Sequence, residues 1–214
     1  QLKENICAIA SDLLDCKPDE LEFAGRAVRR IDGTGEVSLF DIATKSMCGN
    51  ITAVEATASH SSPISPPPFM VGMVEIELDR ETGQVDVLDY AAVVDCGTPV
   101  NPGLARVQTE GGIVQGIGMA LFEDVTYEPT GRIMENSFMQ YKIPTRLDMG
   151  KLRVEFESSY EQTGPFGAKS IGEIVINTPS PAIAHAIAHA TGVWHRELPI
   201  TPEKVLRGIQ KGQE

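Results

Sequence analysis

Hydrophobic residues near the start of the chain recur at the spacing of an amphipathic helix. Leu2, Ile6, Ile9 and Leu13 are separated by four, three and four positions, which places them on one helical face. Because proline cannot continue a helix, we expect this helix to end before Pro18.

The segment that follows has the pattern of a small α/β unit. Residues 21–31 favour short strands before a glycine-containing turn, and Ser38 followed by Asp41 predicts a capped helix. Residues 49–69 are rich in Ser, Thr, Ala and Pro, and they predict an irregular connector because proline removes backbone donors. We therefore assign residues 1–68 to an N-terminal α/β part with its connector.

From residue 69 onward the hydrophobic positions change to the period of a strand. Val74, Ile76 and Leu78 alternate with glutamates, which is typical of a half-buried strand. Residues 79–83 favour a turn, and residues 85–94 form a second β-run. Together they predict a β-hairpin with one solvent-exposed face.

A long helix is predicted after this hairpin. Asn101 followed by Pro102 is a helix start, and about twenty residues of helical pattern follow it. One stripe of the helix is nearly bare, because it consists of residues with no side chain or only a methyl group at a spacing of four, namely Gly112, Gly116 and Ala120. Another backbone or a cofactor can approach this stripe closely. The neighbouring apolar stripe, typical of packing on a sheet, contains Ile113, Ile117 and Leu121.

The C-terminal third adds a hairpin, a strand and two helices. The hairpin is expected around residues 128–131 and the strand near residues 152–156. Ser180–Pro181 predicts a helix that ends at Gly192, and Thr201–Pro202 predicts a last one. We therefore expect an α+β fold made of two small sheet-and-helix subdomains, with residues 69–214 forming the C-terminal part.

Charge and cysteine usage narrow the classes of function. The 214 residues are 42% hydrophobic and carry a formal net charge of -12, which argues against nucleic acid and anionic membranes as partners. No apolar run approaches the roughly 20 residues of a membrane-spanning helix. The four cysteines form no C-x-x-C pair, which argues against a zinc ribbon or an iron–sulfur cluster and favours buried thiols in the cytoplasm. Since the chain opens at Gln1, a fragment and one piece of a split subunit both stay open.

Three local motifs are rejected as sites. Ala168 precedes Lys169 where a phosphate loop needs glycine, and Leu121 stands at the third glycine position of a dinucleotide fingerprint that would begin at Gly116. His185 and His189 have the spacing of a metal pair, but no glutamate follows the first histidine as in zinc proteases. We interpret the two histidines as a surface or packing feature; His60 and His195 do not complete a site.

A glycine-rich stretch, residues 164–173, ends in a carboxylate. Flexible backbone before Glu173 can turn its N–H groups toward a ligand, and the apolar residues 174–176 predict an apolar surrounding. Such a surrounding raises the pKa of a carboxyl group toward neutrality and makes it a usable base. On these features alone, a solvated surface charge is favoured over a general base.

Several segments together resemble one family, the molybdenum hydroxylases that include xanthine dehydrogenase and aldehyde oxidase. They occur in the order and spacing of that family: Val100-Asn101-Pro102, residues 108–118, Tyr141-Lys142-Ile143-Pro144 and residues 167–173. Residues 198–206 are similar to the C-terminus of bacterial members. The resemblance covers the chain from about Phe69 onward, and the preceding part more loosely, and it implies a molybdenum-cofactor-binding domain.

The resemblance implies a role for each matching residue. Glu173 corresponds to the active-site glutamate of the family, the general base that takes a proton from the hydroxide at molybdenum. Gln108 corresponds to the glutamine near the oxo group. The loop whose backbone lies against the pterin corresponds to Lys169, Ser170, Ile171 and Gly172. The dithiolene of the pterin holds the metal in this family, so no protein ligand to molybdenum is expected.

The implied cofactor is the molybdopterin molybdenum cofactor. The molybdenum-binding part of the family is longer than this chain, and no iron–sulfur motif or flavin signature is present. We therefore expect as partners the remaining molybdenum-binding portion and the iron–sulfur and FAD domains or subunits, and an isolated chain without activity. The expected reaction is hydroxylation of a purine or another N-heterocycle with oxygen from water. An aldehyde-oxidising member and a non-catalytic fragment or assembly module stay open.

Overall fold

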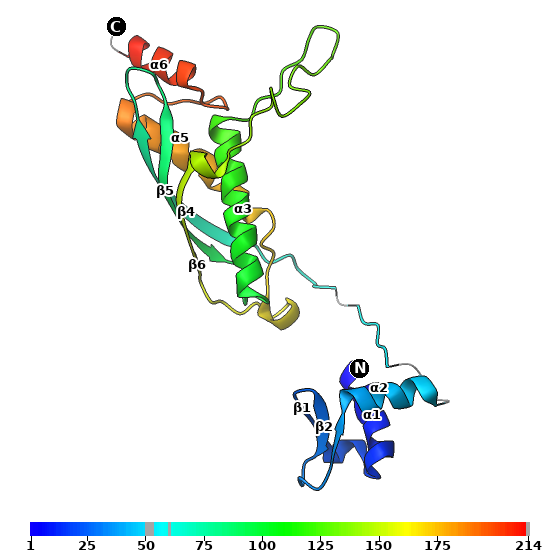
Figure 1. Ribbon diagram of the computed structural model, residues 1–214. Coiled ribbons are helices and arrows are strands. Elements are labelled where there is room, and N and C mark those ends of the chain that lie inside the picture. Colours follow the sequence, from blue (N-terminus) through cyan, green and yellow to red (C-terminus); the bar gives the residue numbers. More distant parts are fainter. Residues whose placement is uncertain (50–53, 60, 213–214) are drawn as a thin grey trace. The chain divides into compact units, whose positions relative to one another are not determined.

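The computed structural model describes residues 1–49, 54–59 and 61–212, which fall into two compact units, Gln1–Ser61 and Ser62–Glu214 (Figure 1). The sequence placed the division between residues 68 and 69. Phe69 is the first residue of a strand, so that position is where regular structure resumes. His60 and residues 50–53, which belong to the predicted connector, lie outside the described residues.

The first unit contains two helices and a three-stranded antiparallel sheet of order β1-β2-β3. Its elements are α1 (Leu2–Leu14), a 3-10 turn (Pro18–Glu20), β1 (Leu21–Ala24), β2 (Ala27–Arg30), β3 (Glu36–Ser38) and α2 (Leu39–Cys48). The predicted first helix and strands are confirmed, whereas β3 was not predicted. Ser38 caps α2 as expected, since its hydroxyl oxygen accepts the N–H of Asp41 at 3.1 Å. The buried core consists of Ile6, Ile9, Ala10, Leu21, Val28 and Ile42.

The second unit is a three-stranded sheet with helices on one face. Its elements are β4 (Phe69–Leu78), β5 (Val85–Asp95), α3 (Pro102–Leu121), a 3-10 turn (Arg146–Asp148), β6 (Met149–Phe156), a 3-10 turn (Pro165–Gly167), α4 (Ile174–Asn177), α5 (Pro179–Thr191) and α6 (Pro202–Lys211). The strand order is β4-β5-β6. β4 and β5 form the predicted antiparallel hairpin, whereas β5 and β6 are parallel. A parallel pair needs a long crossover, which α3 and the extended segment 122–148 provide (Figure 1).

The core of this unit lies between the sheet and the helices α3 and α5. Ile113 and Ile117 of α3 and Ile183 and Ile187 of α5 are fully buried with the inward side chains of the strands. The apolar stripe predicted for α3 is therefore confirmed as a sheet-packing face. The α+β fold class with two small sheets is also confirmed.

One prediction about the C-terminal helices needs correction, and one C-terminal helix was not predicted. The helix expected to begin at Ser180–Pro181 begins at Pro179, after the N-cap position Thr178. Pro181 is tolerated inside the first turn because the N–H groups there have no partner within the helix. The one-turn helix α4 was not predicted, and it makes the residue before it, Glu173, an N-cap position.

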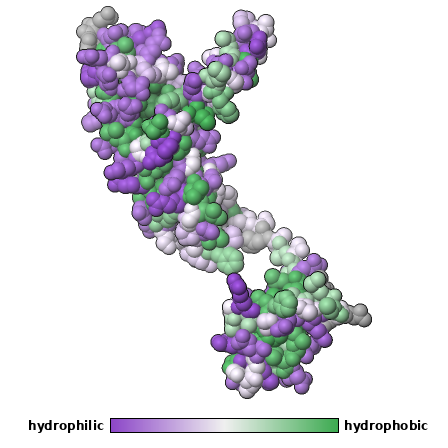
Figure 2. Space-filling model, viewed as in Figure 1, coloured by the Kyte–Doolittle hydropathy of each residue, from purple (hydrophilic) through white to green (hydrophobic). Residues whose placement is uncertain are grey.

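The cysteines and the outer surface complete the description. Cys96 is buried, but Cys48 is exposed, so the prediction of buried thiols is wrong for Cys48. Within the described ranges, no helix is both long enough and apolar enough to cross a membrane. Large apolar side chains such as Met47 in the first unit and Phe138 and Leu147 in the second are more than three quarters exposed. Figure 2 shows apolar side chains on the surface of both units.

Candidate functional site

A tight contact between helices brings the predicted site residues together. A Cβ atom added to Gly112 would lie 2.2 Å from Cγ2 of Val175 in α4, and one added to Gly116 would lie 2.7 Å from Cγ of Pro179 in α5. The bare stripe of α3 is therefore filled by α4 and α5. We call this contact the glycine seam. It holds α3, which carries Gln108, against the segment that contains Glu173.

The contact continues as a hydrogen bond at the end of the predicted loop. Nε2 of Gln108 donates to the carbonyl oxygen of Gly172 at 3.4 Å. These two residues separate two cavities, of about 460 Å³ and about 360 Å³, and each residue lines both of them. We call the larger one the loop cavity, because Ala168, Lys169, Ile171 and Gly172 line it, and the smaller one the glutamate cavity.

The loop cavity is lined by backbone with free donors. The N–H of Lys169 donates to the carbonyl of Cys96 at 2.7 Å, and the N–H of Thr98 donates to the carbonyl of Gly167 at 2.8 Å. Beyond Lys169, the N–H groups of residues 170–173 have no acceptor within the part of the chain that the structure describes. A run of free N–H groups suits a ligand that is rich in acceptor atoms.

Glu173 lines the glutamate cavity together with Gln108 and Gln115. Its side chain is exposed, so the described residues of this chain do not form the apolar surrounding that the sequence predicted. The reason is the geometry of α4. One helical turn directs Val175 into the core, where it is fully buried, and leaves Glu173 at the surface.

Sequence reasoning missed Asp95, the last residue of β5. Its carboxylate accepts hydrogen bonds from Nζ of Lys169 at 2.5 Å, from Oγ of Ser159 at 2.5 Å and from the N–H of Gly97 at 3.0 Å. Burial alone would raise the pKa of Asp95, but these hydrogen bonds outweigh burial and lower the pKa to about 2. The signal in the sequence was an acidic residue directly after the apolar pair Val93-Val94.

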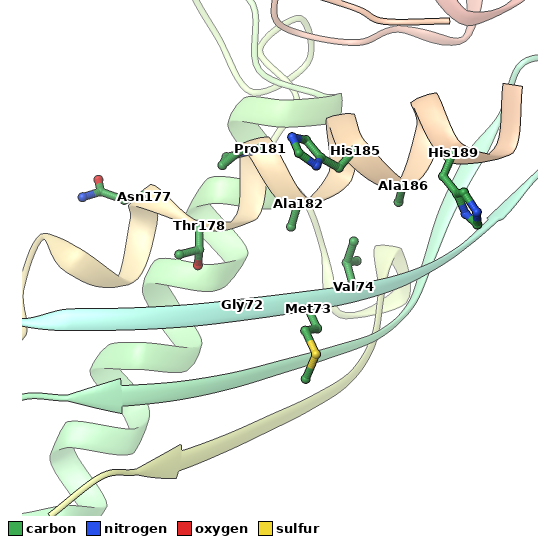
Figure 3. A pocket seen from close by; sticks show the side chains of 10 residues that line it. All are labelled: Gly72, Met73, Val74, Asn177, Thr178, Pro181, Ala182, His185, Ala186 and His189. Atoms are coloured by element: carbon green, nitrogen blue, oxygen red, sulfur yellow. The ribbon is translucent and has the colours of Figure 1, made fainter. Parts of the chain in front are cut away.

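A cavity of about 600 Å³, larger than the loop cavity and the glutamate cavity, lies elsewhere, between β4 and α5 (Figure 3). None of the predicted site residues lines it, although His185 and His189 do. Among the described residues no group of three or more His, Cys, Asp or Glu side chains is arranged to hold a metal ion. The ring of His185 instead meets the ring of Trp194 edge-on, with centroids 4.9 Å apart, in agreement with the packing interpretation.

The residues around the loop cavity fit a large polar cofactor. The free N–H groups of Ile171 and Gly172 and the amide of Gln108 offer donors to the oxygen and nitrogen atoms of a pterin or a phosphate. Because Glu173 follows directly, a proton acceptor lies beside the group that this cavity would hold. The fold and the site thus suit a cofactor-binding domain with a carboxylate beside the loop cavity.

Comparison with known proteins identifies the family. Residues 1–150 match the family model described as a molybdopterin cofactor-binding domain. The chain is 35% identical over 212 residues to the probable hypoxanthine oxidase XdhD of Escherichia coli, a match that covers 98% of the chain and 22% of that protein. The chain therefore belongs to the molybdopterin cofactor-binding domain family of the molybdenum hydroxylases. The family resemblance and the molybdenum cofactor expected from the sequence are both confirmed.

Two further relatives extend this result. The chain is 34% identical over 218 residues to the gamma subunit of the 6-hydroxypseudooxynicotine dehydrogenase complex of Paenarthrobacter nicotinovorans, covering 96% of the chain and 27% of that subunit. The structure of quinoline 2-oxidoreductase from Pseudomonas putida 86 superposes with a TM-score of 0.79 at 27% identity, covering 98% of this chain and 28% of that one. The chain thus spans about a quarter of the length of these relatives.

Proposed function

We propose that this chain is the part of a molybdopterin-dependent hydroxylase that supplies its catalytic base, and that the enzyme hydroxylates an N-heterocycle with oxygen from water. The observation that carries the proposal is the hydrogen bond from Gln108 to the carbonyl of Gly172. It joins the helix and the loop that the family resemblance pairs at the cofactor. It also leaves Glu173, the next residue, on the wall of the adjoining cavity.

Each residue of the site has one physical task. When bound, the cofactor supplies the redox chemistry and the oxygen that is transferred. The N–H groups of residues 170–172 hold it in the loop cavity, where Lys169 anchors the start of the loop. The amide of Gln108 fixes the end of the loop. A carboxylate oxygen of Glu173 accepts the proton that the attacking oxygen loses, as a general base.

The names of the relatives support the substrate class. The hypoxanthine oxidase and the quinoline 2-oxidoreductase are named after nitrogen heterocycles. A carbon atom beside a ring nitrogen is electron-poor and is attacked readily by an oxygen nucleophile. We therefore favour a purine or another N-heterocycle over an aldehyde as substrate.

The enzyme that we propose contains further parts. A relative is named as one subunit of a complex, which supports a partner that completes the molybdenum-binding portion, together with iron–sulfur and FAD domains or subunits. The segment 122–148 carries exposed apolar side chains, among them Tyr127, Met134, Phe138 and Met139. Exposed apolar groups of this kind mark protein contacts. The cysteines of the chain are free, which supports a reducing cytoplasmic location.

The assembled enzyme that carries Glu173→Gln tests the base assignment. We expect a loss of turnover of roughly 10²- to 10⁴-fold, the usual contribution of a general base, with molybdenum and pterin content unchanged. Glu155→Gln, which alters an exposed glutamate on β6, is the matched control and should leave turnover unchanged.

Hypoxanthine, quinoline and an aldehyde serve as test substrates. Turnover of the aldehyde alone would contradict the N-heterocycle assignment. Undiminished turnover in the Glu173→Gln enzyme would contradict the role of the base. Wild-type enzyme without molybdenum would favour the non-catalytic module.

A further inference from the structure

Lys169 belongs to the loop that the family resemblance places against the pterin, yet its ammonium group faces the interior of the protein. Its side chain is 8% exposed, and Nζ lies 2.5 Å from the carboxylate of Asp95. The ring of Phe69 covers the same ammonium group, at 5.4 Å from Nζ to the ring centroid. A cation enclosed in this way is committed to its internal partners.

The carboxylate of Asp95 is the centre of a small network. Besides Lys169, it binds the hydroxyl of Ser159, which follows β6, and the N–H of Gly97, which follows β5. The network therefore ties three segments together at one point. We call Asp95, Ser159 and Lys169 the aspartate clamp.

The clamp acts on the loop at the residue where its free donors begin. The N–H of Lys169 is the last one before the cavity that is bound to the protein, since residues 170–173 offer N–H groups without a described acceptor. The other end of the free run is held by the amide of Gln108 through Gly172. A run of donors that is fixed at both ends is preorganised for a ligand, because ordering it on binding costs little further entropy.

We propose that Asp95 is a positioning residue of the cofactor site: through the side chain of Lys169 it fixes the backbone of residues 170–172 in the conformation that receives the molybdopterin. This inference rests on the proposed function. The charge of Lys169 is used to hold the loop and is not offered to the cofactor.

The competing explanation is that Lys169 binds a phosphate of the cofactor directly. The two explanations differ in how substitutions combine. Removing one member of a buried ion pair leaves an uncompensated charge, whereas removing both members relieves it. If Lys169 serves the clamp, the two substitutions remove the same interaction, so the double variant retains no less cofactor than the worse single variant. If Lys169 binds the cofactor, Asp95→Asn alone has little effect and the loss at Lys169 persists in the double variant.

The test uses the assembled enzyme with Asp95→Asn, Lys169→Met and the double variant. Molybdenum and pterin per protein are measured after repeated dilution, and the electron paramagnetic resonance spectrum of Mo(V) is recorded for the retained cofactor. We expect each single variant to weaken cofactor retention roughly 10- to 100-fold, the usual effect of a residue that supports a metal site indirectly. The double variant should retain no less cofactor than the worse single variant, and Asp95→Asn should change the Mo(V) spectrum.

Asp89→Asn is the matched control. Asp89 lies on the same strand and its carboxylate also binds a cation, Nε of Arg153, at 3.0 Å, but this pair does not contact the loop. This control should match wild type in retention and spectrum. Ser159→Ala removes one hydrogen bond of the clamp without changing its charge. It should weaken retention by a smaller factor, and it serves as the test variant if the charged positions do not tolerate substitution.

Three outcomes would overturn the inference. Wild-type retention and spectrum in both Asp95→Asn and Ser159→Ala would show that the clamp does not position the loop. If Asp95→Asn keeps wild-type cofactor retention while Lys169→Met loses it, alone and in the double variant, then Lys169 binds the cofactor itself. A wild-type enzyme that holds no molybdenum would overturn the proposed function as well, which separates that failure from the other two.

Discussion

The glycine seam and the aspartate clamp hold the same loop from two sides by different forces. At the seam, Gly112 and Gly116 allow α3 to touch Val175 and Pro179, and the side chains that these two glycines meet are apolar. At the clamp, one carboxylate gathers an ammonium group, a hydroxyl and a backbone N–H. The seam depends on shape and the clamp on charge. They should therefore fail under different perturbations.

A methyl group placed in the seam is expected to have the largest effect on stability. The Cβ of Gly112→Ala would lie 2.9 Å from Cβ of Val175, which is fully buried and has no room to move away. Overpacking of this kind typically costs about 1–3 kcal/mol. The measurement is urea unfolding followed by the fluorescence of Trp194, the one tryptophan of the chain.

The neighbouring residue provides the control for this prediction. A Cβ on Gly111 meets no atom within 4 Å, so Gly111→Ala should stabilise α3 by up to about 1 kcal/mol through helix propensity. Equal effects of the two substitutions would show that the seam is not close-packed. Neither effect should depend on pH.

Acid is expected to weaken the clamp and to spare the seam. Because the pKa of Asp95 is lowered from 3.8 to about 2, its ionised form stabilises the folded state at all pH values above about 4. This contribution is lost as the pH falls through about 2. Partial exposure screens it, so we expect about 1–2 kcal/mol.

The stability difference between wild type and Asp95→Asn measures this contribution. The difference should be largest near neutral pH and should shrink as the pH approaches 2, where the wild-type carboxyl group becomes neutral like the amide. Asp89→Asn should change stability by under about 1 kcal/mol throughout, because the cation that it binds, on Arg153, is solvent-exposed. A difference for Asp95→Asn that stays constant down to pH 2 would contradict the assigned pKa.

The contrast between seam and clamp also explains what the sequence could predict. The seam is encoded locally, since Gly112 and Gly116 are four positions apart on one helix, and the sequence analysis identified a surface open to close approach. The clamp is not encoded locally. Lys169 is 74 positions from Asp95, and no periodicity connects residues that meet only through the tertiary fold.

The candidate site follows the same rule. The roles of Gln108 and Glu173 came from the family resemblance, because an exposed glutamine and an exposed glutamate carry no pattern of their own. The apolar surrounding expected for Glu173 was inferred from its neighbours in sequence, residues 174–176. The single turn of helix directs Val175 into the core, and of these three residues only Ile176 lines the glutamate cavity beside Glu173.

The smallest expected effect concerns a polar contact that touches neither seam nor clamp. Asn101 caps α3, and its side-chain oxygen accepts the N–H of Leu104 at 3.0 Å. Loss of such a cap costs about 1 kcal/mol. The damage is confined to the first turn because Pro102, at the helix start, has no N–H group that needs an acceptor. Asn101→Ala should therefore speed hydrogen exchange of the Leu104 amide and leave that of Gln115, deep in the helix, unchanged. Faster exchange at both amides would mean that the seam does not hold α3 independently of its cap.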